Sequence, residues 1–268
     1  MNRIALSLLL VIGCAPADET STPDGGPVDP TPDAGCTGSA CNEVGDCPPG
    51  MVWTSPTTCV DATEATVNDF LQFLDTLGDA CTDPGPTCLA CGGKRCFISN
   101  VDNPWHYEDG GWYIDGPVGL SLEHPARYVT FAAARSACAA QGKRLCGADE
   151  WTRACSGPSQ LAYPYGNTFE PGRCNSANGL FGRPWAVGES ATSASTSTPE
   201  LVDMSGNVWE WTNDCSGGEC QKAGGAFSVD GSFFPNALSC EGRQGHDTVN
   251  ETFGTDHDIG YRCCASPL

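Results

Sequence analysis

The chain has 268 residues and a net charge of −20, from 33 acidic against 13 basic side chains. Such a surface repels polyphosphate, so no nucleic-acid partner is expected. Hydrophobic residues make up 40% of the chain, which excludes disorder throughout, while 33 glycines and 20 prolines predict many turns and little regular structure.

The N-terminus has the pattern of a bacterial lipoprotein signal. Arg3 precedes an apolar run over residues 4–12, which is too short to span a bilayer as a helix. Residues 11–14, Val-Ile-Gly-Cys, resemble the lipobox, and this implies cleavage before Cys14 and acylation of that residue. We therefore expect a signal peptide over residues 1–13 and an exported protein anchored by its lipid in the bacterial cell envelope, in the periplasm or at the outer membrane or cell surface. The alternative is an ordinary secretory signal followed by a chance cysteine.

Three segments are predicted after the signal. Residues 14–35 are rich in Pro, Asp, Thr and Gly and predict a disordered tether. Residues 36–47 carry three cysteines among turn residues and predict a cysteine-rich segment that leads into the domain. Residues 48–268 then form a single domain, because no second boundary is visible in the composition.

Cysteine content indicates a disulfide framework. With Cys14 set aside for the lipid, the number of cysteines falls from 18 to 17. So many cysteines in an exported chain are typical of disulfides. The odd number leaves at least one thiol free or bonded to another molecule.

The predicted elements of the domain are short. In chain order they are a strand at 51–53, a helix at 63–77, a strand at 112–114, a helix at 131–141 and a helix at 148–156. The first helix repeats apolar residues every three or four positions, which predicts one apolar face, with Thr63 or Thr66 as its cap. The second is rich in alanine, and the third has two acidic residues in its first turn, where the helix dipole favours negative charge.

Several motifs follow one another along this domain. They are DATEAT at 61–66, GKRL at 142–145, EW at 150–151, YPYGN at 163–167, DMSGNVWEW at 203–211, GGAF at 224–227 and IGYRC at 259–263. Together they resemble the sulfatase-modifying factor family, also called the formylglycine-generating enzyme family, and DMSGNVWEW is the most specific of them. The resemblance covers residues 48–265 and implies an α+β fold: one irregular, disulfide-rich domain related to C-type lectin-like folds.

The resemblance also implies a calcium site in the DMSGNVWEW motif. Its ligands would be the side chains of Asp203 and Glu210 and the carbonyl oxygens of Gly206 and Val208. Calcium prefers such a mixture of carboxylate and carbonyl oxygens, and a glycine-containing turn can present the carbonyls. The alternative is a tight turn in which both carboxylates accept backbone N–H hydrogen bonds.

Two disulfides are implied by the resemblance, and a third by spacing. Family members join the second helix to the C-terminal strand, which implies a Cys138–Cys263 pair. They also join the end of the third helix to a cysteine before a late arginine, which implies Cys155–Cys240. Cys215 and Cys220 lie close enough in sequence for a local pair. The partners of Cys146, Cys174 and Cys264 stay open.

The residues on which the family's catalytic chemistry depends are replaced in this chain. The enzymes bind copper with two cysteines that follow the Gly-Gly motif and oxidise a substrate cysteine to formylglycine. Those positions hold Val229 and Phe234 here, and Ala226 replaces a supporting serine. Copper binding and disulfide exchange both need a thiolate. We therefore expect neither copper nor the enzyme reaction, and no catalytic residue is assigned.

Three functions remain to be weighed. The favoured one is a non-catalytic, calcium-stabilised binding or scaffold module for an unknown ligand or protein partner. Its candidate cleft is lined by Trp209, Trp211, Ser228, Val229, Phe233 and Phe234. The second is an oxidoreductase of the formylglycine-generating type with unusual ligands, which requires unassigned cysteines to be reduced and clustered near Val229. The third is a purely structural envelope lipoprotein, which predicts no aromatic-lined pocket.

Overall fold

A computed structural model describes residues 46–77, 105–108, 111–114, 121–179, 182–189, 193–247 and 257–268. All of them belong to one unit that runs from Val44 to Leu268. The predicted signal peptide, Cys14, the tether and residues 36–45 of the cysteine-rich segment lie outside the described residues.

Helices and strands are short and separated by long irregular segments. The α-helices in the described residues are α1 (Val67–Leu77), α2 (Phe131–Ala140) and α3 (Ala148–Ser156). The strands are β1 (Met51–Ser55), β2 (Thr58–Asp61), β3 (Trp105–Glu108), β4 (Gly111–Ile114), β5 (Arg144–Leu145), β6 (Trp209–Ser216), β7 (Glu219–Ala223), β8 (Arg243–Asp247), β9 (Ile259–Tyr261) and β10 (Cys263–Ala265). Short 3-10 helices occupy Ala177–Gly179 and Pro235–Leu238.

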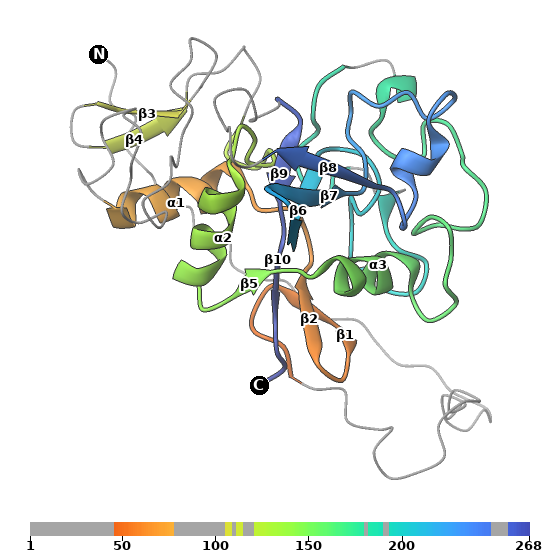
Figure 1. The fold of residues 1–268 in the computed structure, drawn as a ribbon, viewed down its shortest axis with the longest axis horizontal. Coiled ribbons are helices and arrows are strands. Elements are labelled where there is room, and N and C mark those ends of the chain that lie inside the picture. Colours follow the sequence, from red (N-terminus) through yellow and green to blue (C-terminus); the bar gives the residue numbers. More distant parts are fainter. Residues whose placement is uncertain are drawn as a thin grey trace, which may run out of the picture. The chain divides into compact units, whose positions relative to one another are not determined.

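The strands make two four-stranded sheets and one hairpin (Figure 1). The first sheet has the antiparallel order β1-β2-β10-β5. The second has the order β8-β7-β6-β9, in which β6 and β9 run parallel and the other pairs antiparallel. The hairpin joins β3 to β4. The C-terminal strands therefore complete both sheets, and the predicted α+β class is confirmed.

Helix α1 begins later than its apolar pattern predicts. The prediction starts at residue 63, whereas the helix starts at Val67. Thr66 sets this boundary: its Oγ1 accepts a hydrogen bond from the Asp69 N–H at 3.1 Å, and Asp69 Oδ2 accepts one in return from the Thr66 N–H at 2.8 Å. This reciprocal cap satisfies backbone donors that a helix start leaves open.

Helices α2 and α3 begin where the sequence predicts. The Oγ1 of Thr130 caps α2 by accepting a hydrogen bond from the Ala133 N–H at 3.1 Å. Helix α2 ends one residue earlier than predicted, because Gln141 already leaves helical geometry as its C-cap. No helix among the described residues is long and apolar enough to cross a bilayer.

The main core lies between α1, α2 and the central strands. Phe70 of α1 packs edge-on against Tyr261 of β9, with ring centroids 6.2 Å apart. Alanines fill the buried face of α2, and this allows the helix to approach β6 closely. At that approach Phe131 meets Trp211 edge-on, with centroids 5.9 Å apart. The core therefore fixes β6, the strand that carries the WEW residues.

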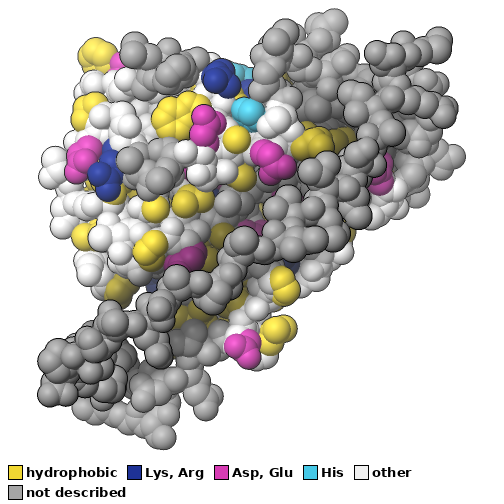
Figure 2. Space-filling view, turned by 180° about the vertical axis from the view of Figure 1, so that it is seen from behind, with side chains coloured by type: hydrophobic (Ala, Val, Ile, Leu, Met, Phe, Trp, Pro, Cys, Tyr) yellow, Lys and Arg dark blue, Asp and Glu magenta, His cyan; other side chains and the backbone are white. Residues whose placement is uncertain are grey.

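Exposed large hydrophobic side chains are few in the described part of the chain. On the face shown in Figure 2, hydrophobic side chains are scattered among polar ones and form no single broad patch. Phe233 and Phe234 are two such side chains that are adjacent in the sequence, and they are 77% and 65% exposed. Exposed aromatic neighbours are typical of binding surfaces.

Candidate functional site

The motif residues meet in a buried network around Glu210. This side chain is 1% exposed and faces Arg262, which is completely buried. Glu210 Oε1 accepts a hydrogen bond from Arg262 Nη2 at 2.9 Å, and Glu210 Oε2 accepts one from Trp151 Nε1 at 2.7 Å. Residues from the EW, DMSGNVWEW and IGYRC motifs are thus in direct contact.

Arg262 extends the network to two more segments. Its Nη1 donates to the Asp61 carbonyl at 2.8 Å, and its Nη2 donates to the Val202 carbonyl at 2.9 Å. Burial alone would lower the pKa of Arg262, but the adjacent Glu210 carboxylate outweighs this and raises it. The arginine is therefore a permanent buried cation that joins three parts of the chain: residue 61, residues 202–210 and its own segment.

Glu64 brings the DATEAT motif into the same network. It accepts hydrogen bonds from Asn207 Nδ2 at 2.6 Å and from the Val208 N–H at 3.2 Å. Burial raises the pKa of Glu64, and the nearby charges of Asp203 and Glu210 raise it further. Glu64 thus holds the DMSGNVWEW turn against the entry to α1.

The turn itself has an unusual backbone. Asp203, Gly206 and Asn207 all have positive φ angles, of 59°, 81° and 58°. At Gly206 a Cβ atom would lie 2.2 Å from the Asn175 carbonyl oxygen, so only glycine fits there. Asp203 Oδ2 accepts a hydrogen bond from the Gly188 N–H at 2.6 Å, and Oδ1 accepts one from Ser193 Oγ at 2.7 Å. Burial raises the pKa of this carboxyl group.

Two observations bear on whether calcium fits this turn: the buried charge, and the hydrogen bonds that the carboxylates already accept. Glu64, Asp203 and Glu210 are three buried carboxylates that share one buried arginine. Burying unbalanced negative charge is costly, so the cluster fits an added cation by charge. Both oxygens of Asp203 and of Glu210 already accept hydrogen bonds. Within the described residues no group of three or more His, Cys, Asp or Glu side chains is arranged to hold a metal ion.

The GKRL and EW motifs form a second set of contacts at the start of α3. Arg144 donates through Nη1 and Nη2 to the two oxygens of Glu150, each at 2.6 Å. Glu150 also accepts a hydrogen bond from the Gly147 N–H at 2.8 Å, which caps the helix. Lys143 forms an ion pair with Asp61 at 2.7 Å. These motif residues therefore hold β5 and the start of α3 in place.

Five disulfides lie among the described residues. Three are the pairs expected from the sequence: Cys138–Cys263, Cys155–Cys240 and Cys215–Cys220. The others are Cys47–Cys59 and Cys146–Cys264. Cys174 is the free cysteine of the described part, and its side chain is buried. Burial raises the pKa of the Cys174 thiol to about 12, so the unreactive thiol form dominates at neutral pH.

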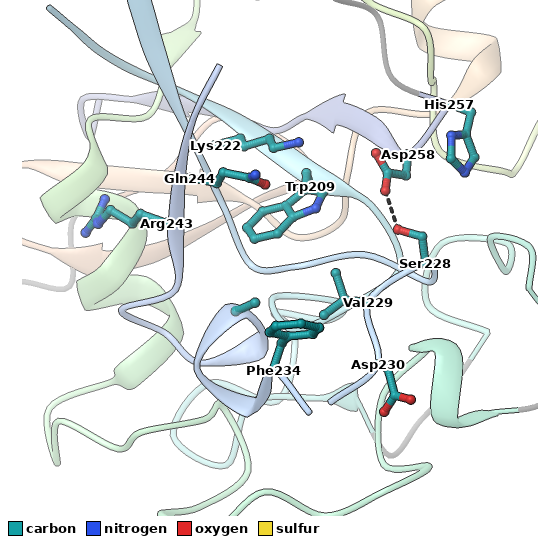
Figure 3. A pocket seen from close by; sticks show the side chains of 11 residues that line it. Trp209, Lys222, Ser228, Val229, Asp230, Phe234, Arg243, Gln244, His257 and Asp258 are labelled. Carbon is teal, nitrogen blue, oxygen red and sulfur yellow. Dashed lines mark hydrogen bonds between the residues drawn. The ribbon is translucent and has the colours of Figure 1, made fainter. Parts of the chain in front are cut away.

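A cleft of about 580 Å³ lies beside β6, β7 and the loop after the Gly-Gly motif. It is lined by Trp209, Lys222, Ser228, Val229, Asp230, Phe234, Ala237, Arg243, Gln244, His257 and Asp258 (Figure 3). Both positions where the resemblance implies copper-binding cysteines, Val229 and Phe234, are on this wall. The structure thus brings together Trp209, Ser228, Val229 and Phe234 from the predicted set.

Two predicted cleft residues lie elsewhere. Trp211 is 1% exposed, packs against Phe131 of α2 and donates from Nε1 to the Val129 carbonyl at 2.8 Å. It lies two positions beyond Trp209 on β6, on the part of the strand that α2 covers. Phe233 is 77% exposed and does not line the cavity. The prediction was therefore wrong for Trp211 and Phe233.

The polar side of the cleft was not predicted. Lys222 of β7 holds its ammonium 5.1 Å from the centroid of the Trp209 ring, and Ser228 Oγ donates to Asp258 Oδ2. Arg243 directs its guanidinium away from the cavity toward α3, where it donates to the Ala148 carbonyl at 2.8 Å (Figure 3). The one sequence signal was the position of Lys222, two residues before the first glycine of the GGAF motif.

A second cavity, of about 870 Å³, lies at the end of α3. Its wall is mainly hydroxyl and amide side chains, including Thr152, Ser156, Gln160 and Asn167. Tyr163 is the one aromatic side chain on its wall, and neither Val229 nor Phe234 lines it. We therefore treat the first cleft as the candidate functional site.

Comparison with known proteins identifies the family. Residues 17–267 match the profile of the "Sulfatase-modifying factor enzyme 1-like domain". The chain therefore belongs to the sulfatase-modifying factor family. The disulfide-rich fold of this family is consistent with an exported protein.

The names of its relatives describe some of them as inactive and others as enzymes. "Inactive C-alpha-formylglycine-generating enzyme 2" of Bos taurus is 39% identical over 99 residues, which cover 34% of this chain and 33% of that protein. The protein of the same name from Mus musculus is 31% identical, covering 54% of this chain and 50% of that protein. "Formylglycine-generating enzyme" of Thermomonospora curvata is 28% identical, covering 62% and 65%. The chain thus spans between a third and two thirds of the length of these relatives.

Two solved structures share the fold. PvdO from Pseudomonas aeruginosa matches with a TM-score of 0.53 at 15% identity, covering 79% of this chain and 80% of that one. Treponema denticola variable protein 1 matches with a TM-score of 0.50 at 14% identity, covering 78% and 84%. At such identities the match concerns the fold alone.

Proposed function

We propose that the chain is a non-catalytic member of its family that binds a small ligand in the cleft beside Trp209. One observation carries this proposal: Val229 and Phe234, which replace the copper-binding cysteines, line that cleft. Neither side chain can supply a thiolate, so copper binding and thiol oxidation have no ligand there. Two relatives that carry "inactive" in their names support this reading.

The cleft has the features of a ligand site. Its volume of about 580 Å³ is within the range of small-molecule pockets, which combine apolar walls with a few polar groups. Trp209, Val229 and Phe234 supply the apolar wall, while Lys222 and Asp258 supply charge. A purely structural lipoprotein would have no need of this aromatic-lined cavity, so that alternative is disfavoured.

Within the described residues, the oxidoreductase alternative lacks the pair of thiols that it needs. It requires at least two reduced cysteines near Val229, but Cys146 is bonded to Cys264. Cys174 packs in a cluster that Val229 also contacts, yet it is a single buried thiol with a pKa of about 12. Copper, oxygen and a cysteine-containing peptide should therefore leave the peptide mass unchanged. Formation of the aldehyde product would overturn the non-catalytic proposal.

Two neighbouring phenylalanines allow a matched test of the cleft. The fluorescent dye 8-anilinonaphthalene-1-sulfonate, which binds apolar pockets, serves as the probe. We expect Phe234→Ala to weaken dye binding severalfold, because Phe234 lines the cavity, and Phe233→Ala to leave it unchanged, because Phe233 does not. Both side chains are exposed, so neither variant should unfold. Equal effects of the two variants would mean that the dye reports surface aromatics and would contradict the cleft as the site.

We also propose that the protein is anchored in the bacterial cell envelope through Cys14. The lipobox-like sequence at 11–14 supports this, together with the exported character of a disulfide-rich domain. Cells fed an alkyne-tagged fatty acid should label the wild-type chain, and Cys14→Ser should carry no label. Label that persists in Cys14→Ser would exclude this anchor.

Calcium binding at Asp203, Gly206, Val208 and Glu210 is proposed as a stabilising function. The excess of buried negative charge around Arg262 favours it. Calcium that binds the folded state alone raises the thermal midpoint, and a chelator such as EGTA lowers it again. The midpoint should rise with calcium and stay constant with magnesium. A midpoint that is the same in calcium and in EGTA would mean that hydrogen bonds alone hold the turn.

A further inference from the structure

The cavity at the end of α3 takes no part in the function proposed above, although its volume of about 870 Å³ is in the range of small-molecule sites. Its wall is mainly polar, with hydroxyl groups, carboxamides and two charged groups from Thr152, Ser156, Ser239, Gln160, Asn167, Asn236, Arg153 and Glu241. Leu161, Ala162 and Tyr163 add apolar surface. A ligand in this cavity would therefore meet chiefly polar groups, unlike a ligand in the aromatic cleft.

Covalent and hydrogen bonds fix the wall of this cavity. The Cys155–Cys240 disulfide joins α3 to residues 239–241, and both segments line the cavity. Thr152 Oγ1 donates a hydrogen bond to the Cys240 carbonyl at 3.0 Å, and the Cys240 N–H donates one to the Ala162 carbonyl at 2.8 Å. A site that is already ordered loses less entropy when a ligand binds.

One hydroxyl group on this wall belongs to a buried residue and has no protein partner. Ser156 is 8% exposed and lines the cavity, but its Oγ makes no hydrogen bond within the described residues. Thr152, one helical turn earlier, both donates to the Cys240 carbonyl and accepts from Arg243. Buried hydroxyl groups usually have a hydrogen-bond partner, so the partner of Ser156 has to lie in the cavity. Ser156 therefore presents a donor and an acceptor to whatever fills it.

Neutral amide groups on the same wall are also without partners in the part of the chain that the structure describes. The side-chain amides of Gln160 and Asn236 have none, and Asn167 uses only its Oδ1, which accepts a backbone hydrogen bond at 3.0 Å. Gln160 also has a φ angle of 52°, which is uncommon for a residue other than glycine and is found more often at ligand sites. Amides both donate and accept hydrogen bonds, as the hydroxyl groups of a sugar do.

The two charged groups of the wall balance each other. Arg153 and Glu241 are exposed, and neither forms an ion pair in the described ranges. Helix α3 ends at Ser156, and the partial negative charge of a helix C-terminus disfavours an anion, as does the net charge of −20. A cationic ligand would in turn be repelled by the Arg153 guanidinium. An uncharged ligand with several hydroxyl groups therefore fits this wall best.

We propose that the cavity at the end of α3 is a binding site for an uncharged saccharide. The hydroxyl groups of the sugar exchange hydrogen bonds with Ser156 and Asn236, and the C–H face of its ring packs on Leu161. This second site is separate from the cleft beside Trp209, because the two cavities share none of their described lining residues. The inference is therefore independent of the function proposed for the cleft.

Glycan binding tests this proposal directly. The full chain is applied to an array of immobilised glycans that holds uncharged oligosaccharides beside sialylated and sulfated ones. We expect binding to a subset of the uncharged glycans and weaker binding to the charged ones. The uncharged glycan that binds best then serves as the soluble probe in calorimetric titrations of the full chain.

Matched serine variants locate the bound glycan. Ser156→Ala removes a hydroxyl group without a protein partner, so the fold should persist while affinity falls about three- to tenfold, as for the loss of one hydrogen bond. Ser159→Ala removes an exposed hydroxyl group that does not line the cavity and should leave affinity unchanged. Asn236→Ala should weaken binding as Ser156→Ala does, and Phe234→Ala, in the other cleft, should have no effect. Circular dichroism confirms that each variant is folded.

Several results would overturn the saccharide site. If no uncharged glycan on the array binds, or if the sialylated and sulfated glycans bind more tightly, the ligand class is wrong. If Ser156→Ala and Ser159→Ala have equal effects, the glycan binds elsewhere on the protein. Loss of binding in Phe234→Ala would place the glycan in the cleft beside Trp209 instead. The dye experiment on that cleft does not depend on these results, so failure of the saccharide site leaves its proposed function standing.

Discussion

Arg262 is a family motif residue whose role is structural, because it connects separate segments of the chain. Its guanidinium contacts Glu210 and the carbonyl groups of Asp61 and Val202, which lie in separate parts of the chain. A planar fork of five donors suits this role, whereas a lysine would offer a single point charge. The residues that reveal the family in the sequence are therefore the ones that hold the fold.

Replacing Arg262 should be severely destabilising. Arg262→Met leaves the Glu210 carboxylate buried without its cation, and such a change costs about 3–5 kcal/mol. Urea denaturation measures the loss. The control is Arg135→Met, because Arg135 is an exposed arginine of α2 that lies over the Phe131 ring, and it should cost less than about 1 kcal/mol. Similar losses for both variants would contradict the role given to Arg262.

Glu150 should make stability depend on acidic pH. Burial alone would raise its pKa, but hydrogen bonds from Arg144 and the Gly147 N–H outweigh this and lower it below the ordinary value of 4.5. A lowered pKa in the folded state adds stability above pH 4.5, and this is lost as pH falls toward the folded pKa. Glu150→Gln should therefore cost on the order of 1 kcal/mol at pH 7 and progressively less as the pH falls below 4.5.

The exposed neighbour Asp149 supplies the control for this pH dependence. Asp149→Asn removes a carboxylate from the same helical turn without removing the bonds of Glu150. Urea midpoints measured between pH 2 and pH 7 should converge at low pH for Glu150→Gln and the wild type. A gap between them that stays constant across this range would contradict the role of the ionised Glu150.

At the scale of elements, capping residues decide where the helices start. Thr66 delays α1 to Val67, and Thr130 begins α2 at Phe131. The alanines of α2 then allow the helix to lie close to β6, which removes Trp211 from the cleft and leaves Trp209 at its edge. The position of one helix thus decides which of two similar tryptophans can meet a ligand.

The cap of α2 can be tested by a matched pair. Thr130→Ala removes the acceptor for the Ala133 N–H and should destabilise the protein by about 1 kcal/mol. Thr130→Ser keeps the hydroxyl group and should lose only a fraction of this. Thermal unfolding compares the two variants with the wild type. A larger loss for the serine variant would mean that the methyl group of Thr130 matters more than its cap.

Elements with regular patterns could be predicted from the sequence, and those set by tertiary pairing could not. Helix α3 was predicted with two acidic residues in its first turn, and the structure has the same bounds. Strands β9 and β10 have only three residues each, too few for any periodicity, and their pairing with β6 and β2 is decided across the whole chain. Short strands of this kind depend on partners that a local pattern does not contain.

The same limit applies to the cleft. Val229 and Phe234 could be placed because their spacing from the Gly-Gly motif is fixed by the family resemblance. Lys222 lies on β7 and Asp258 directly before β9, and the direction in which each side chain faces depends on how these strands pack. Their place on the wall of one cavity could therefore not be predicted. Phe233 was placed in the cleft, but of these two exposed neighbours only Phe234 lines the cavity.

At the scale of the whole molecule, packing determines which thiol can react. Cys174 is 3% exposed and its pKa is raised to about 12, so iodoacetamide should not modify it at pH 7 in the folded protein. Peptide mapping should find Cys174 alkylated only after unfolding without reductant, while the disulfide-bonded cysteines stay unmodified. Rapid alkylation of Cys174 in the native state would contradict its burial.

Two adjacent cysteines, Cys263 and Cys264, connect the last strand to earlier parts of the chain through disulfides. Cys263 is bonded to Cys138 at the end of α2, and Cys264 is bonded to Cys146 after β5. The strand that carries both completes one sheet, and β9 just before it completes the other. The ribosome makes residues 259–265 after all the segments with which they pair, so neither sheet can close before β9 and β10 have been synthesised. Folding and disulfide formation in this domain therefore follow the synthesis of β9 and β10, an order that is consistent with an exported protein.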